Sequence, residues 1–161
     1  MNADTESFLR SMTHPVKFRM FLLSRLPSAF FAGVRIRKID GRQCTVTVPY
    51  KWFSQNPFRS TYFACLSMAA EMSTGALAMA HLYKQNPPVS MLVVKVESEY
   101  FKKAIGITTF ICNDGALFEE AIRESIATGE PRVVRAHSTG RNNAGDVIAE
   151  FYVTWSFRAK R

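Results

Sequence analysis

Cysteine, histidine and acidic residues are all scarce in this sequence. Its 161 residues include three cysteines, three histidines and 13 acidic side chains. The cysteines, Cys44, Cys65 and Cys112, are odd in number, widely spaced and set in apolar sequence. They therefore exclude a disulfide framework and predict reduced core residues of a cytoplasmic protein. No histidine or cysteine has the spacing of metal ligands, so we expect no metal and no resident cofactor.

Long apolar runs are also missing. No stretch of about 18 uninterrupted apolar residues occurs, which predicts that the chain has no transmembrane segment. Asp4 and Glu6 stand where the basic start of a secretory signal would lie, so no signal peptide is expected. With 47% hydrophobic residues and neither repeats nor low-complexity segments, residues 1–161 fit a single domain. Residues 1–32 are expected to form a helical extension packed on it.

The shortage of acidic side chains gives the chain a formal net charge of +8, because 21 lysines and arginines oppose them. Such a balance favours an anionic partner: nucleic acid, an anionic membrane surface or a phosphate-bearing small molecule. The basic residues are scattered, however, and an ordinary solvated basic surface accounts for them equally well. Nucleic acid is not the expected partner, since aromatic RNA-binding motifs and a helix-turn-helix pattern are both absent from the sequence.

Hydrophobic patterning predicts an ordered series of helices and strands. A short amphipathic helix begins at Thr13-His14-Pro15 and ends at Pro27. Asp40-Gly41 lies between two alternating runs and predicts a two-residue hairpin turn with positive φ at both central positions. Further along, the pattern predicts, in order, a long helix at 61–84, strands at 91–103 and 105–112, a short helix at 116–128, and a hairpin of strands at 132–138 and 147–157.

The long helix decides the fold class. Residues 61–84 are apolar nearly all round, which is typical of a buried helix. The last strand alternates between an apolar and a half-polar face, as expected of an antiparallel sheet with one covered side. Since the strands are the material available to cover the helix, the sequence predicts an α+β fold. In that fold a curved antiparallel sheet wraps around a long central helix, with a short N-terminal helix beside it.

Residues 56–75 carry a resemblance to a known family. The relevant positions are Asn56, Ser60-Thr61, Phe63, Ala64-Cys65 and Glu71, with Tyr100-Phe101-Lys102-Lys103 and Val153-Thr154-Trp155 in the flanks. In this order they resemble the hotdog-fold, thioesterase-like superfamily, and within it an uncharacterised hotdog domain family related to acyl-CoA thioesterases. The resemblance implies the hotdog fold and a homodimer or dimer of dimers. Where many hotdog thioesterases have His-Gly-Gly, this chain has Phe63-Ala64-Cys65.

Glu71 is the candidate catalytic acid. It is the only charged residue between positions 61 and 80, and it shares a predicted helix stripe with Ser67 and Thr74. A carboxylate in apolar surroundings has a raised pKa, which suits a general base or a group that orients an attacking water. The alternative is a structural glutamate that pairs with a cation or caps a neighbour in the dimer core.

The remaining site residues lie around the start of the helix. Backbone amides at Ala64 and Cys65 are candidate oxyanion donors, because a helix start offers free N–H groups and a favourable dipole. Two further roles follow from the resemblance: Asn56 as a residue that positions the thioester or the water, and a Glu71 supplied by the partner subunit's helix. The expected substrate-contacting residues are Phe63, Ser67, Thr74, Arg59, Lys102 and Lys103, with the three cations facing the phosphates of coenzyme A or a carrier's phosphopantetheine.

These features give two hypotheses of different classes. The first is a thioesterase-like hydrolase that cleaves an acyl-CoA or acyl-carrier thioester by carboxylate-assisted attack of water at a dimer interface. Coenzyme A would then be part of the substrate and not a bound cofactor. The second is a non-catalytic hotdog module that binds acyl chains or acyl-CoA, which the missing glycines favour. Cys65 is not expected to be a nucleophile, since no histidine is near it in sequence and burial raises the pKa of a thiol.

Overall fold

A computed structural model describes residues 3–160, with side chains from residue 5 onward. Residues 1–2 and 161 of the predicted domain lie outside the described residues. In chain order the elements are α1 (Ala3–Thr13), α2 (Pro15–Arg25), α3 (Pro27–Ala32), β1 (Arg35–Ile39), β2 (Cys44–Val48), the 3-10 helix η1 (Trp52–Ser54), α4 (Phe63–Leu82), β3 (Val89–Tyr100), β4 (Thr108–Cys112), α5 (Gly115–Thr128), β5 (Arg132–Arg141) and β6 (Val147–Ala159).

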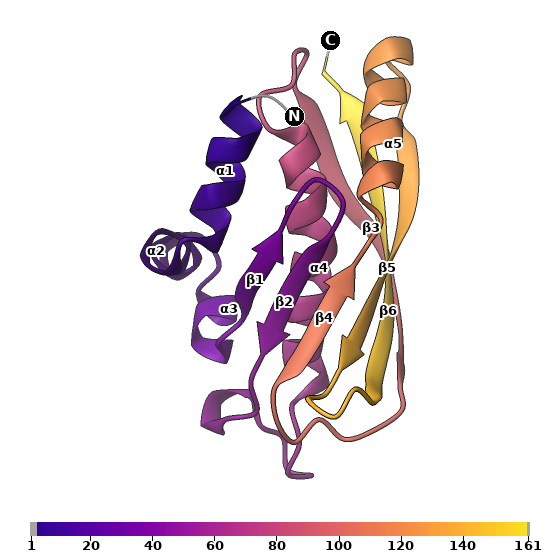
Figure 1. The fold of residues 1–161 in the computed structure, drawn as a ribbon. Helices are drawn as coiled ribbons and strands as arrows, with labels where there is room; N and C mark the ends of the chain where they lie inside the picture. Colours follow the sequence, from indigo (N-terminus) through magenta and orange to yellow (C-terminus); the bar gives the residue numbers. More distant parts are fainter. Residues whose placement is uncertain (1–2, 161) are drawn as a thin grey trace.

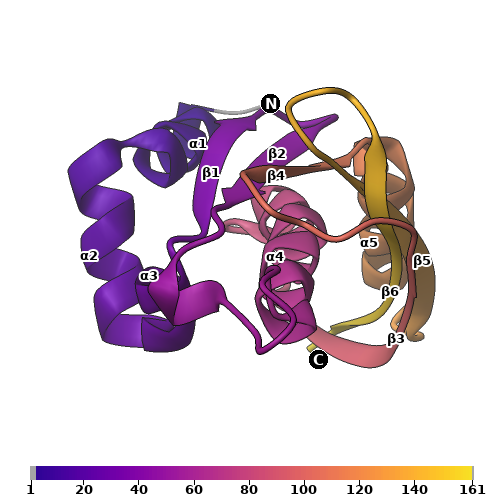
Figure 2. The same cartoon turned by 90° about the horizontal axis from the view of Figure 1, so that it is seen from below.

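The six strands form one antiparallel sheet that curves around α4 (Figures 1 and 2). Their order across the sheet is β1-β2-β4-β5-β6-β3, so β1 and β3 are the two edges. The alternation predicted for the last strand is confirmed, because Phe151, Val153 and Phe157 of β6 are fully buried under the helix layer. The predicted α+β class and the hotdog arrangement, a curled sheet around a central helix, are therefore confirmed.

The central helix is less enclosed than its composition predicts. Twelve of the 20 residues of α4 are buried, but Phe63, Ser67 and Glu71, at four-residue intervals, and Met79, eight residues further on, form a stripe that is half-buried or exposed. The helix is long and apolar enough to cross a membrane, yet 67% of its apolar window is buried inside the protein. Burial of that extent confirms the predicted core helix, and the open stripe is the part of α4 that a single chain leaves uncovered.

The N-terminal extension contains the predicted helix and two more. In α2 the His14 side chain caps the helix, since its Nδ1 accepts hydrogen bonds from the N–H groups of Val16 (3.2 Å) and Lys17 (3.3 Å). The helices α1 and α3 were not anticipated. They cover the β1 side of the molecule, where the Phe8 ring of α1 stacks on Tyr83 with centroids 4.7 Å apart.

The hairpin turn between β1 and β2 lies one residue later than predicted, and its two central residues do not have the predicted positive φ. The last strand pair is Ile39 with Cys44, and the Asp40 N–H donates to the carbonyl of Gln43, so the two central residues are Gly41 and Arg42. The reason is the Asp40 side chain, whose Oδ1 accepts from the N–H groups of Arg42 (2.8 Å) and Gln43 (2.9 Å). These bonds place Asp40 before the turn and not within it.

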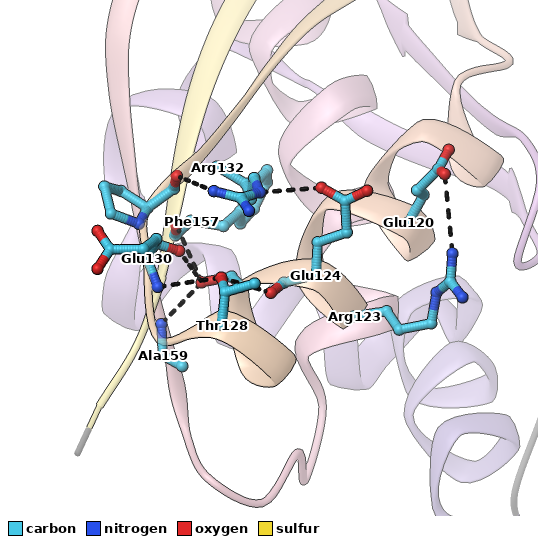
Figure 3. Close-up of polar contacts among 10 residues, drawn as sticks. Glu120, Arg123, Glu124, Thr128, Glu130, Arg132, Phe157 and Ala159 are labelled. Carbon is cyan, nitrogen blue, oxygen red and sulfur yellow. Dashed lines mark hydrogen bonds and ion pairs between the residues drawn. The ribbon is translucent and has the colours of Figure 1, made fainter.

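Helix α5 packs on β5 and β6 and is fixed at both ends. The side chain of its N-cap residue, Asp114, makes no hydrogen bond to the helix, because its carboxylate accepts from the N–H of His137 (2.6 Å). At the other end Gly129 adopts the left-handed conformation that closes the helix, with φ of 73°. Figure 3 shows the contacts there: Ser125 Oγ accepts from the Ala159 N–H (3.0 Å), and Arg132 pairs with Glu124 (2.9 Å).

Candidate active site

The loop that leads into α4 is organised by Asn56. Its Oδ1 accepts hydrogen bonds from the Phe58 N–H (2.9 Å), the Ser60 N–H (3.2 Å) and the Ser60 hydroxyl (3.2 Å). The next residue, Thr61, donates from its N–H (2.7 Å) and its hydroxyl (3.1 Å) to the carbonyl of Ala104. Asn56 thus fixes the entry to the helix, and Thr61 ties that entry to the segment that follows β3.

A groove of about 590 Å³ opens between these two segments. Its lining includes the predicted residues Asn56, Phe63, Lys102 and Lys103. Aromatic side chains dominate the rest of its walls: Phe58, Tyr62, Tyr100 and Phe101. An apolar groove with a few polar groups at its rim is the usual form of a small-molecule site. The structure therefore brings together four of the residues that sequence reasoning singled out.

The three predicted phosphate-contacting cations are placed differently from one another. Lys102 forms an ion pair with Asp146 (3.0 Å), and Lys103 Nζ donates to the carbonyl of Phe58 (3.3 Å) across the groove. Arg59 is exposed and does not line the groove. Its φ of 57° lies in the left-handed region, so the backbone turns sharply there. Lys103 is the cation held most directly at the groove.

The first turn of α4 supplies two free amides. Tyr62 is the N-cap residue, and the Cys65 N–H already donates to the Tyr62 carbonyl (2.9 Å). Among the described residues the N–H groups of Phe63 and Ala64 have no acceptor. These amides carry the positive end of the helix dipole, so the helix start can stabilise an oxyanion through Phe63 and Ala64. Cys65 cannot add a third donor while it bonds Tyr62.

The Glu71 carboxyl and the Trp155 indole both lie close to Gly75. A Cβ built on Gly75 would lie 3.2 Å from Glu71 Oε1 and 3.1 Å from the Trp155 ring, so both side chains approach the helix where this glycine leaves room. Within the part of the chain that the structure describes, the Glu71 carboxyl forms neither a hydrogen bond nor an ion pair. Burial raises the pKa of Glu71 above its ordinary value, because the charged form loses solvation and gains no contact in exchange.

Thr74 departs from the predicted polar stripe. It is fully buried, and its hydroxyl accepts a hydrogen bond from Trp155 Nε1 (2.9 Å) while donating to the Glu71 carbonyl (2.9 Å). Thr74 therefore holds the indole that lies beside Gly75, and it does not line the groove. Ser67, one turn before Glu71, is half-buried on the open stripe of the helix.

Sequence reasoning missed Trp155 and Gly75 as parts of the Glu71 site. A glycine within a helix costs stability, so Gly75 was a visible sign that another group approaches the helix closely. Trp155 lay on the predicted inward face of the last strand. Nothing in the local sequence of either residue indicates that they meet at Glu71.

Within a single chain, Glu71 lies apart from the groove. Glu71 is not among the residues that line it, and two helical turns separate Glu71 from Ala64, which is about 10 Å along the axis.

A larger cavity, of about 680 Å³, lies at the opposite end of α4, where His81 Nε2 is 2.8 Å from the Gly41 carbonyl oxygen. Across the described residues no three His, Cys, Asp or Glu side chains are placed to hold a metal ion.

Solved structures with this fold come from several bacteria. A Pseudomonas aeruginosa protein of unknown function, named a probable thioesterase, is 17% identical, with a TM-score of 0.76 over 93% of this chain and 99% of its own. A Chlorobaculum tepidum protein of unknown function is 18% identical, with a TM-score of 0.76 over 94% and 99%. A Haemophilus influenzae thioesterase is 12% identical, with a TM-score of 0.63 over 87% and 88%.

The sequence comparisons are narrower. No curated protein matches this chain. A family model described as a domain of unknown function, DUF4442, matches residues 16–156. This range includes the whole of α4 and all the strands, except for the last three residues of β6. Because that match covers most of the sequence, the chain belongs to the DUF4442 family, and its fold is the hotdog fold shared with these thioesterase-like structures.

Proposed function

We propose that this protein hydrolyses acyl thioesters, with acyl-CoA or an acyl carrier as substrate, in the cytoplasm. The observation that carries the proposal is Glu71: a desolvated carboxyl without a polar partner, on the open stripe of the central helix. Burial raises the pKa of this carboxyl, which makes its carboxylate a stronger base and suits it to the role of a general base. The likeness to two bacterial proteins named as thioesterases supports the same chemistry.

In the proposed reaction Glu71 removes a proton from a water molecule as its oxygen attacks the thioester carbonyl carbon. The negative charge that develops on the carbonyl oxygen is stabilised by the free N–H groups of Phe63 and Ala64. When the intermediate collapses, the C–S bond breaks and the thiol leaves with the proton. Asn56 acts by holding the loop that positions these amides, and Lys103 sits where a phosphate of the leaving group can bind.

The proposed active unit is a dimer in which Glu71 serves the groove of the other copy. Two features support it. The open stripe of α4 is an uncovered face of an otherwise enclosed helix, and β3 is an edge strand with exposed apolar side chains at Leu92, Val94 and Val96. A second copy bound along β3 would cover the open stripe and the exposed side chains of β3. It would also bring Glu71 of one copy closer to the start of α4 in the other copy.

The first test is thiol release from a panel of acyl-CoA substrates of increasing chain length. Glu71→Gln keeps the size of the side chain but cannot accept a proton, and it should lower kcat by about 100-fold or more. The matched control is Glu119→Gln, an exposed carboxyl on α5. Full activity in Glu71→Gln would refute the mechanism.

The second test asks whether two chains build one site. Phe63→Pro removes an amide donor at the first helical position, where proline is tolerated, and Phe63→Ala is its control because it keeps the N–H. Phe63→Pro and Glu71→Ala should each be inactive alone. Mixed dimers of the two contain one intact site, so random mixing should restore roughly a quarter of wild-type activity. No recovery in verified mixed dimers would place both groups in one chain.

A second candidate function is acyl binding without catalysis. The aromatic groove favours it, and so do the side chains of Phe63-Ala64-Cys65, which leave less room at the helix start than glycines would. Fatty acid or acyl-CoA that co-purifies with the protein, together with no thiol release from any panel member, would select this alternative.

A further inference from the structure

The β1 side of the molecule carries a cluster of cations without carboxylates. Arg19, Arg35, Arg37 and Lys51 line a recess of about 290 Å³ between α2, α3 and the β1–β2 hairpin, and no acidic residue lines it. In the described residues none of the four forms an ion pair. Four cations that line one recess without an acidic residue give this part of the surface a local positive charge.

Exposed aromatic side chains are interleaved with these cations. Trp52 is 82% exposed, and Phe31 and Phe53, both about half-exposed, have ring centroids 5.7 Å apart. The Arg19 guanidinium lies 4.8 Å from the centroid of Phe30, which also contacts Phe31. We call the set Arg19, Arg35, Arg37, Lys51, Phe31, Trp52 and Phe53 the basic–aromatic patch. Exposing this much apolar surface in water is unfavourable unless something covers it.

Helix α2 extends the apolar surface on the same side of the molecule. Val16, Met20 and Leu23 lie at helical spacing and are exposed, while Phe18 and Leu22 on the other face are buried. The helix contains Lys17, Arg19 and Arg25 but no acidic residue. Figure 2 shows α2 and α3 on the side of the molecule away from α5, so this surface lies at the β1 edge, opposite β3.

We propose that the basic–aromatic patch and the exposed stripe of α2 dock the protein on an anionic lipid membrane. Lysine and arginine are attracted to the negative headgroups, tryptophan and phenylalanine insert at the headgroup level, and an apolar helix stripe lies in the interface. Nucleic acid would satisfy the cations and could stack on the aromatics, but it offers nothing to Val16, Met20 and Leu23. The surface is separate from Glu71 and the groove, so docking does not depend on the proposed hydrolysis.

The test uses the full chain with vesicles of phosphatidylcholine alone and of phosphatidylcholine with phosphatidylglycerol. Binding in a flotation assay should require phosphatidylglycerol and weaken as salt is raised. Arg35→Glu with Arg37→Glu should weaken binding by about 30-fold or more, since each basic residue near an anionic surface contributes about fivefold. The matched control, Arg123→Glu with Arg158→Glu, changes the net charge equally at exposed positions on α5 and β6 and should bind nearly as wild type.

Tryptophan fluorescence tests insertion directly. The chain has two tryptophans, and Trp155 is only 5% exposed whereas Trp52 is 82% exposed. A blue shift on adding anionic vesicles, lost in Trp52→Phe, is the expected result. Equal weakening in both charge-reversed pairs would overturn the patch as a docking surface, as would a bound protein with unshifted Trp52 emission. Tight binding of single-stranded RNA without binding to vesicles would overturn the lipid assignment.

Discussion

Replacing Glu71 by glutamine should stabilise the protein at neutral pH while it removes the proposed activity. The carboxylate is half-buried beside Gly75 and has no hydrogen-bond donor among the described residues, so its charged form is solvated worse in the folded chain than in the unfolded one. A buried polar group without a partner costs about 1–3 kcal/mol, and the partial exposure of Glu71 places its cost near the lower limit. A gain of about 1 kcal/mol in the free energy of unfolding corresponds to a rise of roughly 2–4 °C in Tm for a domain of this size.

The direction of the pKa shift of Glu71 determines how the stability gained in Glu71→Gln changes with pH. Because burial raises the pKa of Glu71 in the folded protein, the folded state binds the proton more tightly than the unfolded state. The contribution of Glu71 to stability is therefore fully present below its unfolded pKa and is lost as pH rises through its folded pKa. The advantage of Glu71→Gln should be present at pH 8 and should vanish near pH 4. Urea unfolding followed by far-UV circular dichroism at both pH values measures it.

Glu97 is the matched control for this measurement. Hydrogen bonds from Arg135 and then Lys95 lower the pKa of its carboxyl, so its charge is favoured in the folded state. Glu97→Gln should give no stabilisation at pH 8. A lower free energy of unfolding for Glu71→Gln at pH 8 would refute the reasoning, because it would mean that the Glu71 anion has a partner.

Three further predictions concern the surroundings of Glu71 and the thiols. Thr74→Val leaves the indole N–H of Trp155 buried without an acceptor and should lower the free energy of unfolding by about 1–3 kcal/mol in urea; an unchanged midpoint would contradict this hydrogen bond. Gly75→Ala should lower kcat/KM, because the added Cβ crowds Glu71, while a gain in helix propensity of about 1 kcal/mol keeps stability near wild type; unchanged kcat/KM would show that the position of Glu71 is unimportant. Burial raises the pKa of Cys112 to about 12, so its thiol should not react with a disulfide reagent at pH 8 until the chain is unfolded, and rapid labelling of the native protein would contradict that burial.

The sequence predicted the sheet and the central helix because both have periodic signals. The two-residue alternation along β6 is an unambiguous mark of one covered face, and α4 had too many small apolar residues to be anything but a core helix. Its open stripe could not be predicted in this way. Phe63 and Met79 are as apolar as their buried neighbours, so composition does not distinguish a side covered by the sheet from a side left for another molecule.

The candidate site was only partly predictable, for a different reason. Asn56 and Phe63 were singled out by the family resemblance, and because they lie in one short segment, the loop brings them to one groove. The environment of Glu71 depends on Trp155, which belongs to the last strand and reaches the helix through the closure of the sheet. Thr74 was assigned to the groove from helical spacing alone, but spacing does not show which stripe the indole covers.

The arrangement of the sheet explains why catalysis and assembly would depend on each other in this chain. The N-terminal helices occupy the β1 side of α4, where α1 and α3 both contact it. Glu71 lies on the other side, toward β6. Strand β6 pairs with β5 on one side and with β3 on the other, and β3 is the edge of the sheet. In the proposed dimer a second copy would approach along β3 and would bring its own helix α4 toward Glu71. Such a contact would remove Glu71 further from water and raise its pKa again, which is the change that a base working near neutral pH needs.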